Sequence, residues 1–199
     1  MPLSLLKCCH YPTMVAIRRS KNLCRQIEKN NAIRNAQSVL ATARNRGLLT
    51  IFVNIGWRPG FPELPKNHDY PLLQGANDGE QRHRRHLGGR CHRCPPAHNE
   101  PIVINFGSDS FEGTDLDRLL RAANVGHLFV SGQCIEHVVA TTIKRAANMG
   151  YNAVLIKDAT SGFTDSNYSA MLDIPAALRQ AHLVGGVHAG SALWRHGAR

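Results

Sequence analysis

The chain has 199 residues, of which 43% are hydrophobic, and a formal net charge of +10. This length favours a single domain, residues 1–199, with a core of its own, and no apolar run is long enough to cross a bilayer. The basic excess lies in residues 1–99, which hold 16 Lys and Arg against 5 Asp and Glu, whereas residues 100–199 hold 8 against 9. The second half therefore has the balance of an ordinary cytosolic enzyme, and the first half has either a nucleic-acid surface or atypical sequence.

The N-terminal residues, MPLSLLKCCHYP, do not form a convincing signal peptide, because the apolar run is short and two cysteines follow it. We therefore expect a cytoplasmic, reducing environment in which the six cysteines are reduced thiols rather than a disulfide framework. Residues 13–17 (TMVAI) predict a first short strand, although Arg18 and Arg19 follow it directly.

The next predicted elements alternate between helix and strand. Apolar residues on one face predict an amphipathic helix over residues 30–46, and the nearly continuous apolar run 48–55 is typical of a parallel strand covered on both faces. A second short strand is predicted at residues 101–105, beyond a proline-rich loop. Thr114 and Asp117, which have capping-box spacing, predict the start of the next helix.

Residues 125–159 give the clearest pattern in the chain. A strand at residues 127–131 ends at Gly132, a helix follows and stops at Gly150, and a second strand covers residues 152–156. Such a unit makes two parallel strands joined by a crossover helix. Because ligands of open α/β sheets bind at the carboxyl ends of strands, the turn after Gly132 is the predicted site.

A last helix is predicted near residues 168–181, where Pro175 can interrupt it. The alternation of strands and helices, with no internal repeat, predicts an α/β domain with a mostly parallel sheet. Residues 1–24, 75–99 and 183–199 fit this pattern least well.

Four segments, in this order, resemble the isochorismatase-like, or cysteine hydrolase, superfamily: ATARNRGLLTIFV, RPGFPEL, EPIVIN…SFEGTDLDRLLRAANV and SGQCIEHVVATTIKRAANMGYNAVLIKDA. The resemblance is best over residues 30–64 and 100–163. It implies a three-layer α/β/α sandwich with flavodoxin/Rossmann-like topology, commonly oligomeric. It also implies a hydrolase acting on a small amide or vinyl ether.

The resemblance further implies a site of one Asp, one Lys and one Cys. A thiolate in the first turn of a helix is stabilised by the helix dipole, while the Asp moves protons and the Lys supports developing charge. In this sequence the Lys position falls on Asn105 and the Cys position on Val138. The Asp position, expected after residues 13–17, has Arg18 and no carboxylate. The sequence therefore predicts a pseudoenzyme with little or no activity.

Other residues could replace the lost groups. Cys134 is either a displaced nucleophile with His137 as its base or a small buried cysteine. Glu136 and His137 are either proton-transfer groups or ordinary polar residues of a first helical turn. Asp109 and Asp158 are interpreted as turn and capping residues. The predicted substrate pocket is lined by Trp57, Phe111, Gly132, Gln133 and Ile135.

Residues 75–99 form an atypical insertion rich in Arg, His, Cys and Pro. One interpretation is a zinc site made by His83, His86, Cys91 and Cys94, whose spacing suits metal ligands. A second is a basic phosphate- or RNA-contacting loop, which the lack of stacking aromatic residues disfavours. A third is a local frameshift or a degraded paralogue, which the two alternative reading frames of the gene would test.

The leading hypothesis is therefore an isochorismatase-like protein without a cofactor that takes a small-molecule ligand and forms homo-oligomers. A non-catalytic binding or oligomerisation protein with a basic first half is the first alternative, and a zinc-binding variant of the fold is the second. Neither a nucleic-acid nor a membrane partner is expected.

Overall fold

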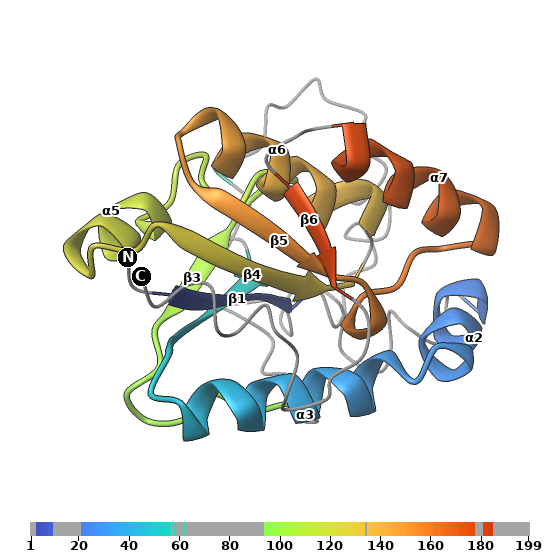
Figure 1. The fold of residues 1–199 in the computed structure, drawn as a ribbon, viewed down its shortest axis with the longest axis horizontal. Coiled ribbons are helices and arrows are strands. Elements are labelled where there is room, and N and C mark those ends of the chain that lie inside the picture. Colours follow the sequence, from blue (N-terminus) through green and yellow to red (C-terminus); the bar gives the residue numbers. More distant parts are fainter. Residues whose placement is uncertain are drawn as a thin grey trace.

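The computed structural model describes residues 3–9, 21–56, 58, 62, 94–133, 135–177 and 181–184. Six strands form one sheet in the order β3-β2-β1-β4-β5-β6, and every described pair of neighbours is parallel (Figure 1). The strands are β1 Leu3–Cys9, β2 Leu49–Ile55, β3 Ile102–Asn105, β4 His127–Gly132, β5 Asn152–Ile156 and β6 Ala181–Val184. Because the chain runs outward to β3 and then returns to β4, the strand order reverses beside β1.

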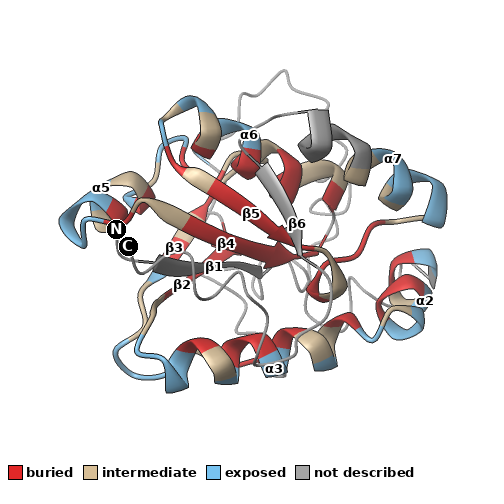
Figure 2. Ribbon diagram, viewed as in Figure 1, coloured by how far each residue is buried: buried red, intermediate tan, exposed pale blue. Residues whose placement is uncertain are grey.

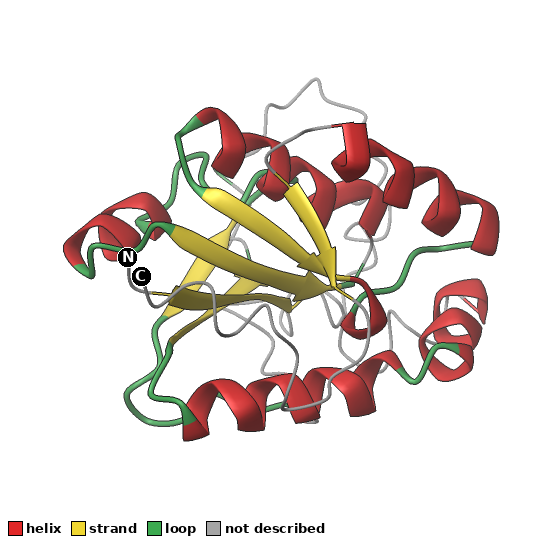
Figure 3. Cartoon of the chain, in the orientation of Figure 1, coloured by secondary structure: helices red, strands yellow, loops and turns green. Residues whose placement is uncertain are grey.

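Helices cover both faces of this sheet, which gives the three layers that the family resemblance implies (Figure 3). One face carries α3, with α2 next to it, and the other carries α5, α6 and α7 (Figure 1). The bounds are α2 Lys21–Lys29, α3 Ala32–Asn45, α5 Leu116–Ala122, α6 Ala140–Asn148 and α7 Asp165–Ala177. None of the helices in the described parts of the chain is long and apolar enough to cross a membrane.

Two apolar clusters hold the layers together. Alternate residues of β2 point to opposite faces, so Ile51 and Val53 join the cluster under α5 and α6, whereas Phe52 joins the cluster under α3. Figure 2 shows the buried stripe of α3 turned toward the strands. Burial on both faces explains why the β2 sequence is nearly continuous in apolar residues, as predicted.

Four details of the sequence prediction differ from the structure. The first strand is Leu3–Cys9, whereas the predicted strand at residues 13–17 lies outside the described residues. The segment 3–9 contains Lys7 and two cysteines and so has weak strand patterning, but it pairs with β2 and β4 on both sides. Helix α2 was not predicted at all.

The third difference concerns α7. This helix starts at Asp165 and ends at Ala177, and Pro175 lies in its last turn. The predicted helix end at residue 181 is wrong, because residues 181–184 form β6 and pair with β5. Residues 181–184 are a strand because they pair with β5, and the local spacing of apolar residues does not reveal such pairing.

The predicted capping box is also wrong. The Thr114 hydroxyl oxygen accepts a hydrogen bond from the Leu116 N–H (3.2 Å), as a capping side chain does. Asp117, however, accepts hydrogen bonds from the Tyr151 hydroxyl (2.7 Å) and Arg121 Nε (2.9 Å). The Asp117 carboxylate therefore binds Tyr151, from outside the helix, instead of capping the start of the helix as the local spacing predicted.

Candidate active site at the carboxyl edge of the sheet

The predicted strand–helix–strand unit is present, and it brings the expected turn to the carboxyl edge of the sheet (Figure 1). After β4 the chain makes a π-helical turn, Ile135–Val139, which leads into α6. π-Helical turns are rare and often mark functional sites. Asn105, the last residue of β3, ends at the same edge, since all these strands are parallel.

Hydrogen bonds join the turn after Gly132 to the loop that follows β5. The Ile135 N–H donates to the Ser161 carbonyl oxygen (3.0 Å), and the Ser161 N–H donates to the Gly132 carbonyl oxygen (3.3 Å). The Ser161 hydroxyl lies 2.7 Å from Oε1 of the fully buried Gln133. The Ile135 amide is therefore engaged within the protein and is not available to hold an oxyanion.

Val138, at the position where the resemblance implies the nucleophile, is 2% exposed and belongs to the cluster under α5 and α6. It packs there with Ile135 and Val139. Its methyl groups thus complete the apolar core. Cys134, the proposed substitute nucleophile, lies outside the described residues.

Asn105, at the position of the implied Lys, is 0% exposed. Its Oδ1 accepts a hydrogen bond from the Gly107 N–H (2.9 Å), and its Nδ2 has no partner. The neighbouring strand contributes Asn54, which is also buried and whose Oδ1 has no partner. The edge thus holds neutral carboxamides with hydrogen-bonding capacity left over.

Glu136 is the carboxylate that the structure places in the turn. Its Oε1 accepts hydrogen bonds from the Phe163 N–H (2.7 Å) and Asn167 Nδ2 (3.3 Å), and its Oε2 is buried without a partner. The ring of His137 stands edge-on to the Phe163 ring, with centroids 5.8 Å apart. These contacts turn Glu136 toward the loop after β5.

One tyrosine close to this loop has a shifted pKa. The Tyr168 hydroxyl donates to the Lys157 carbonyl oxygen (2.8 Å). Burial, and then the nearby Asp158 carboxylate, raise the pKa of Tyr168 to about 12. The phenol is therefore a neutral hydrogen-bond donor near neutral pH.

Phe111 and Trp57 were predicted to line the pocket with Gly132, Gln133 and Ile135. Phe111 instead is buried in the core and stacks on Tyr151, with ring centroids 6.0 Å apart, beside the start of β5. Trp57 lies outside the described residues. Asp109 fits its predicted role, because its Oδ1 accepts the Phe111 N–H (2.9 Å) within a turn.

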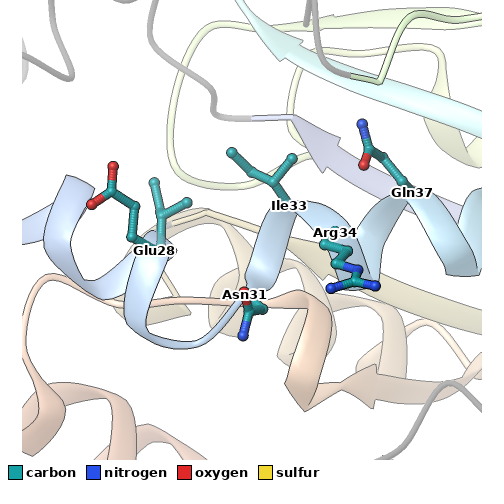
Figure 4. A pocket seen from close by; sticks show the side chains of 6 residues that line it. Glu28, Asn31, Ile33, Arg34 and Gln37 are labelled. Carbon is teal, nitrogen blue, oxygen red and sulfur yellow. The ribbon is translucent and has the colours of Figure 1, made fainter.

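A separate hollow of about 600 Å³ lies where α2 meets α3 (Figure 4). The chain turns there through Asn31, whose φ of 50° is in the left-handed region that asparagine tolerates. The lining residues are Ile27, Glu28, Asn31, Ile33, Arg34 and Gln37. None of them is a predicted site residue, and sequence reasoning gave no signal for this hollow.

The alternative zinc site has one ligand within the described residues. Cys94 is 1% exposed and packs in the apolar cluster under α3. His83, His86 and Cys91 lie outside the described residues. Within the described ranges no group of three or more His, Cys, Asp or Glu side chains is arranged to hold a metal.

Comparison with known proteins places this chain and its fold in one family. The isochorismatase domain model matches residues 14–183. The chain is 27% identical over 144 residues to the ureidoacrylate amidohydrolase RutB of Variovorax paradoxus, covering 64% of this chain and 55% of that protein. It is 28% identical over 150 residues to the streptothricin hydrolase of Streptomyces noursei, covering 75% and 45%. The chain thus spans about half the length of these two relatives.

Among solved structures, an isochorismatase family protein from Desulfovibrio vulgaris has the same fold. Its TM-score is 0.74 at 20% identity, over 99% of this chain and 98% of that chain. The two relatives compared above are hydrolases by name, and the matched domain covers most of the present sequence. The chain therefore belongs to the isochorismatase-like hydrolase family.

Proposed function

We propose that this protein keeps the ligand-binding edge of its family but hydrolyses small amides and vinyl ethers weakly or not at all. The observation that carries the proposal is the environment of Val138, which is buried among Ile135, Val139 and other core residues at the implied nucleophile position. An aliphatic side chain has no lone pair with which to attack a carbonyl carbon.

The other two implied groups are missing as well. Asn105 can donate a hydrogen bond but has no positive charge with which to stabilise a developing oxyanion. No Asp or Glu precedes Glu28 in the sequence, so β1 carries no carboxylate at its end. A general acid or base contributes about 10²–10⁴-fold and a charge-stabilising donor a similar factor, so their joint loss removes most of the family rate.

The test is a hydrolase screen over small amides and vinyl ethers with the protein as it stands. We expect turnover close to the uncatalysed background. The double variant Val138→Cys plus Asn105→Lys is the gain-of-function comparison, and Val138→Cys alone changes the core volume little. Rapid turnover by the unmodified chain would overturn the proposal, because it would mean that other residues supply the chemistry.

The same screen should include a variant of Glu136, because this residue is a carboxylate at the edge with one unpartnered oxygen. Vinyl ether cleavage needs only a proton donor, so any residual activity should depend on this side chain. Glu136→Gln keeps the hydrogen bond from the Phe163 N–H and removes the proton-transfer group. Residual turnover that is unchanged in Glu136→Gln would exclude this role.

The resemblance also implies a homo-oligomer, which we propose for this chain. Size-exclusion chromatography with light scattering measures the mass of the particle directly. A particle with the monomer mass of 21.9 kDa at micromolar concentration would contradict the proposal.

A further inference from the structure

The hollow between α2 and α3 is made by residues outside the candidate active site. Its lining comes from the last turn of α2, the connecting residue Asn31 and the first two turns of α3, and it includes no strand end and no residue of the turn after β4. Its volume of about 600 Å³ is within the range of small-molecule sites. A compound bound there would not occupy the edge on which the proposed function depends.

Two isoleucines give the hollow an apolar wall. Ile27 is 5% exposed and forms a small cluster with Leu23, against which Ile33 and Phe163 pack. This cluster is separate from the two larger clusters that join the helices to the sheet. An aliphatic group of a ligand placed against Ile27 and Ile33 would remove apolar surface from water, which favours binding.

The two charged residues of the lining have opposite signs and come from different helices. Glu28 belongs to α2 and Arg34 to α3, and Ile33 lies between them in Figure 4. Both side chains are exposed, and among the residues that the structure describes neither has a hydrogen-bond or ion-pair partner. A ligand with a positive group near Glu28 and a negative group near Arg34 can therefore form two charge-assisted contacts without breaking any within the protein.

The remaining lining residues are two carboxamides, Asn31 and Gln37. A carboxamide both donates and accepts hydrogen bonds, as the peptide group of a ligand does. Asn31 has a φ of 50°, and its side chain makes no capping hydrogen bond with α3. Its amide is thus not committed to the helix that it precedes. Gln37 lies four residues after Ile33 on α3, so the two side chains are on the same face.

We infer that this hollow binds a short zwitterionic peptide, of the dipeptide class, with an aliphatic side chain. Glu28 binds the terminal ammonium group, and Arg34 binds the terminal carboxylate. Ile27 and Ile33 contact the aliphatic side chain, and Asn31 bonds the peptide group. The backbone of such a peptide separates its two charges, whereas a single amino acid carries both on one carbon atom. The inference goes beyond the proposed function and does not depend on it.

The dipeptide L-leucyl-L-leucine is the probe. Its N-acetylated, C-amidated form is the control, because it keeps both side chains and removes both charges. Isothermal titration calorimetry with the full chain should show dipeptide binding at millimolar concentration, at least about tenfold tighter than the blocked form, which corresponds to ~1.4 kcal/mol. Free L-leucine should bind more weakly than the dipeptide. Absence of dipeptide binding at millimolar concentration would overturn the inference, as would equally tight binding of the blocked form or of leucine.

Two variants test the assignment of the charges. Glu28→Gln and Arg34→Gln should each weaken dipeptide binding by about threefold, as expected for one exposed ion pair, and leave binding of the blocked form unchanged. Both positions are exposed, and thermal unfolding shows whether each variant keeps its fold. Unchanged dipeptide binding by both folded variants would refute the assignment.

Lys144→Gln is the matched control for the loss of a positive charge. Lys144 is exposed on α6, which covers the other face of the sheet, and it does not line the hollow. This variant should bind the dipeptide as tightly as the parent. A loss equal to that of Arg34→Gln would show that the net charge of the protein, rather than the hollow, governs binding, and would overturn the inference.

Discussion

The Tyr151 hydroxyl donates to Oδ1 of Asp117 over 2.7 Å, although the two residues are 34 positions apart. This bond joins α5 to the turn before β5, and the Arg121 guanidinium lies 5.5 Å from the Tyr151 ring centroid. We expect Tyr151→Phe to lower the free energy of unfolding by about 1 kcal/mol, because water can reach the partly exposed Asp117 and replace the lost donor.

Urea denaturation of both single variants and the double variant checks this coupling. Tyr151→Phe should cost much less when Asp117 is already Asn, since the charged acceptor is then gone. If the two effects simply add, the negative charge of Asp117 does not strengthen this bond.

The same pair predicts a dependence of stability on pH at both extremes. Burial alone would raise the pKa of Asp117, but hydrogen bonds from Arg121 and Tyr151 outweigh it and hold that pKa below 3.8. In acid the unfolded chain therefore takes up the proton first. The stabilisation by this carboxylate is present above pH 3.8 and is lost as the pH falls below it.

The contribution of Tyr151 to stability depends on pH in the opposite direction. Burial, and then the bond to Asp117, raise its pKa from 10.0 to about 12. The unfolded chain loses this proton first, so the stabilisation is lost as the pH rises from 10 to 12. Denaturation midpoints against pH, for the parent and for Asp117→Asn, measure both effects. If the parent and Asp117→Asn lost stability in parallel as the pH fell, Asp117 would not be the source of the acid dependence.

Gly162 allows the loop after β5 to lie against Glu136. A Cβ at this position would meet both carboxylate oxygens of Glu136 and Cγ2 of Ile135 at 3.1 Å. The Phe163 N–H holds the carboxylate in place, so it cannot easily move aside. We expect Gly162→Ala to lower the unfolding free energy by about 1–3 kcal/mol through overpacking.

Gly107→Ala is the matched control, because a Cβ there would meet no atom within 4 Å. In thermal unfolding, the melting temperature of Gly162→Ala should be clearly lower than that of Gly107→Ala. Adding Glu136→Ala to Gly162→Ala should recover part of the loss. Equal melting temperatures for the two alanine variants would show that the loop adjusts without cost.

Cys94 should resist alkylation in the native protein. Its side chain is 1% exposed in the cluster under α3, whereas Cys24 on α2 is half-buried, and neither is in a disulfide. Labelling with N-ethylmaleimide followed by peptide mapping should modify Cys24 well before Cys94. Rapid native labelling of Cys94, suppressed by zinc, would instead support the alternative metal site.

The sequence predicts the β4–α6–β5 unit well, because its three elements follow one another and each has a strong local pattern. It predicts β2 and β3 for the same reason. It misses β1 and β6, which have weak local patterning and are strands because they pair with β2, β4 and β5. Phe111 was predicted to line the pocket from its place in the family pattern, but its ring stacks on Tyr151.

The amino-acid sequence by itself determined the family of this protein, the alternation of its central elements and the residue types at the implied Lys and Cys positions, Asn105 and Val138. These are properties of composition and local spacing. Only the tertiary structure decided which edge groups lack hydrogen-bond partners, how the Asn105 amide is turned and where Glu136 points. Each of these depends on contacts between segments distant in the chain, and local patterns carry no information about such contacts.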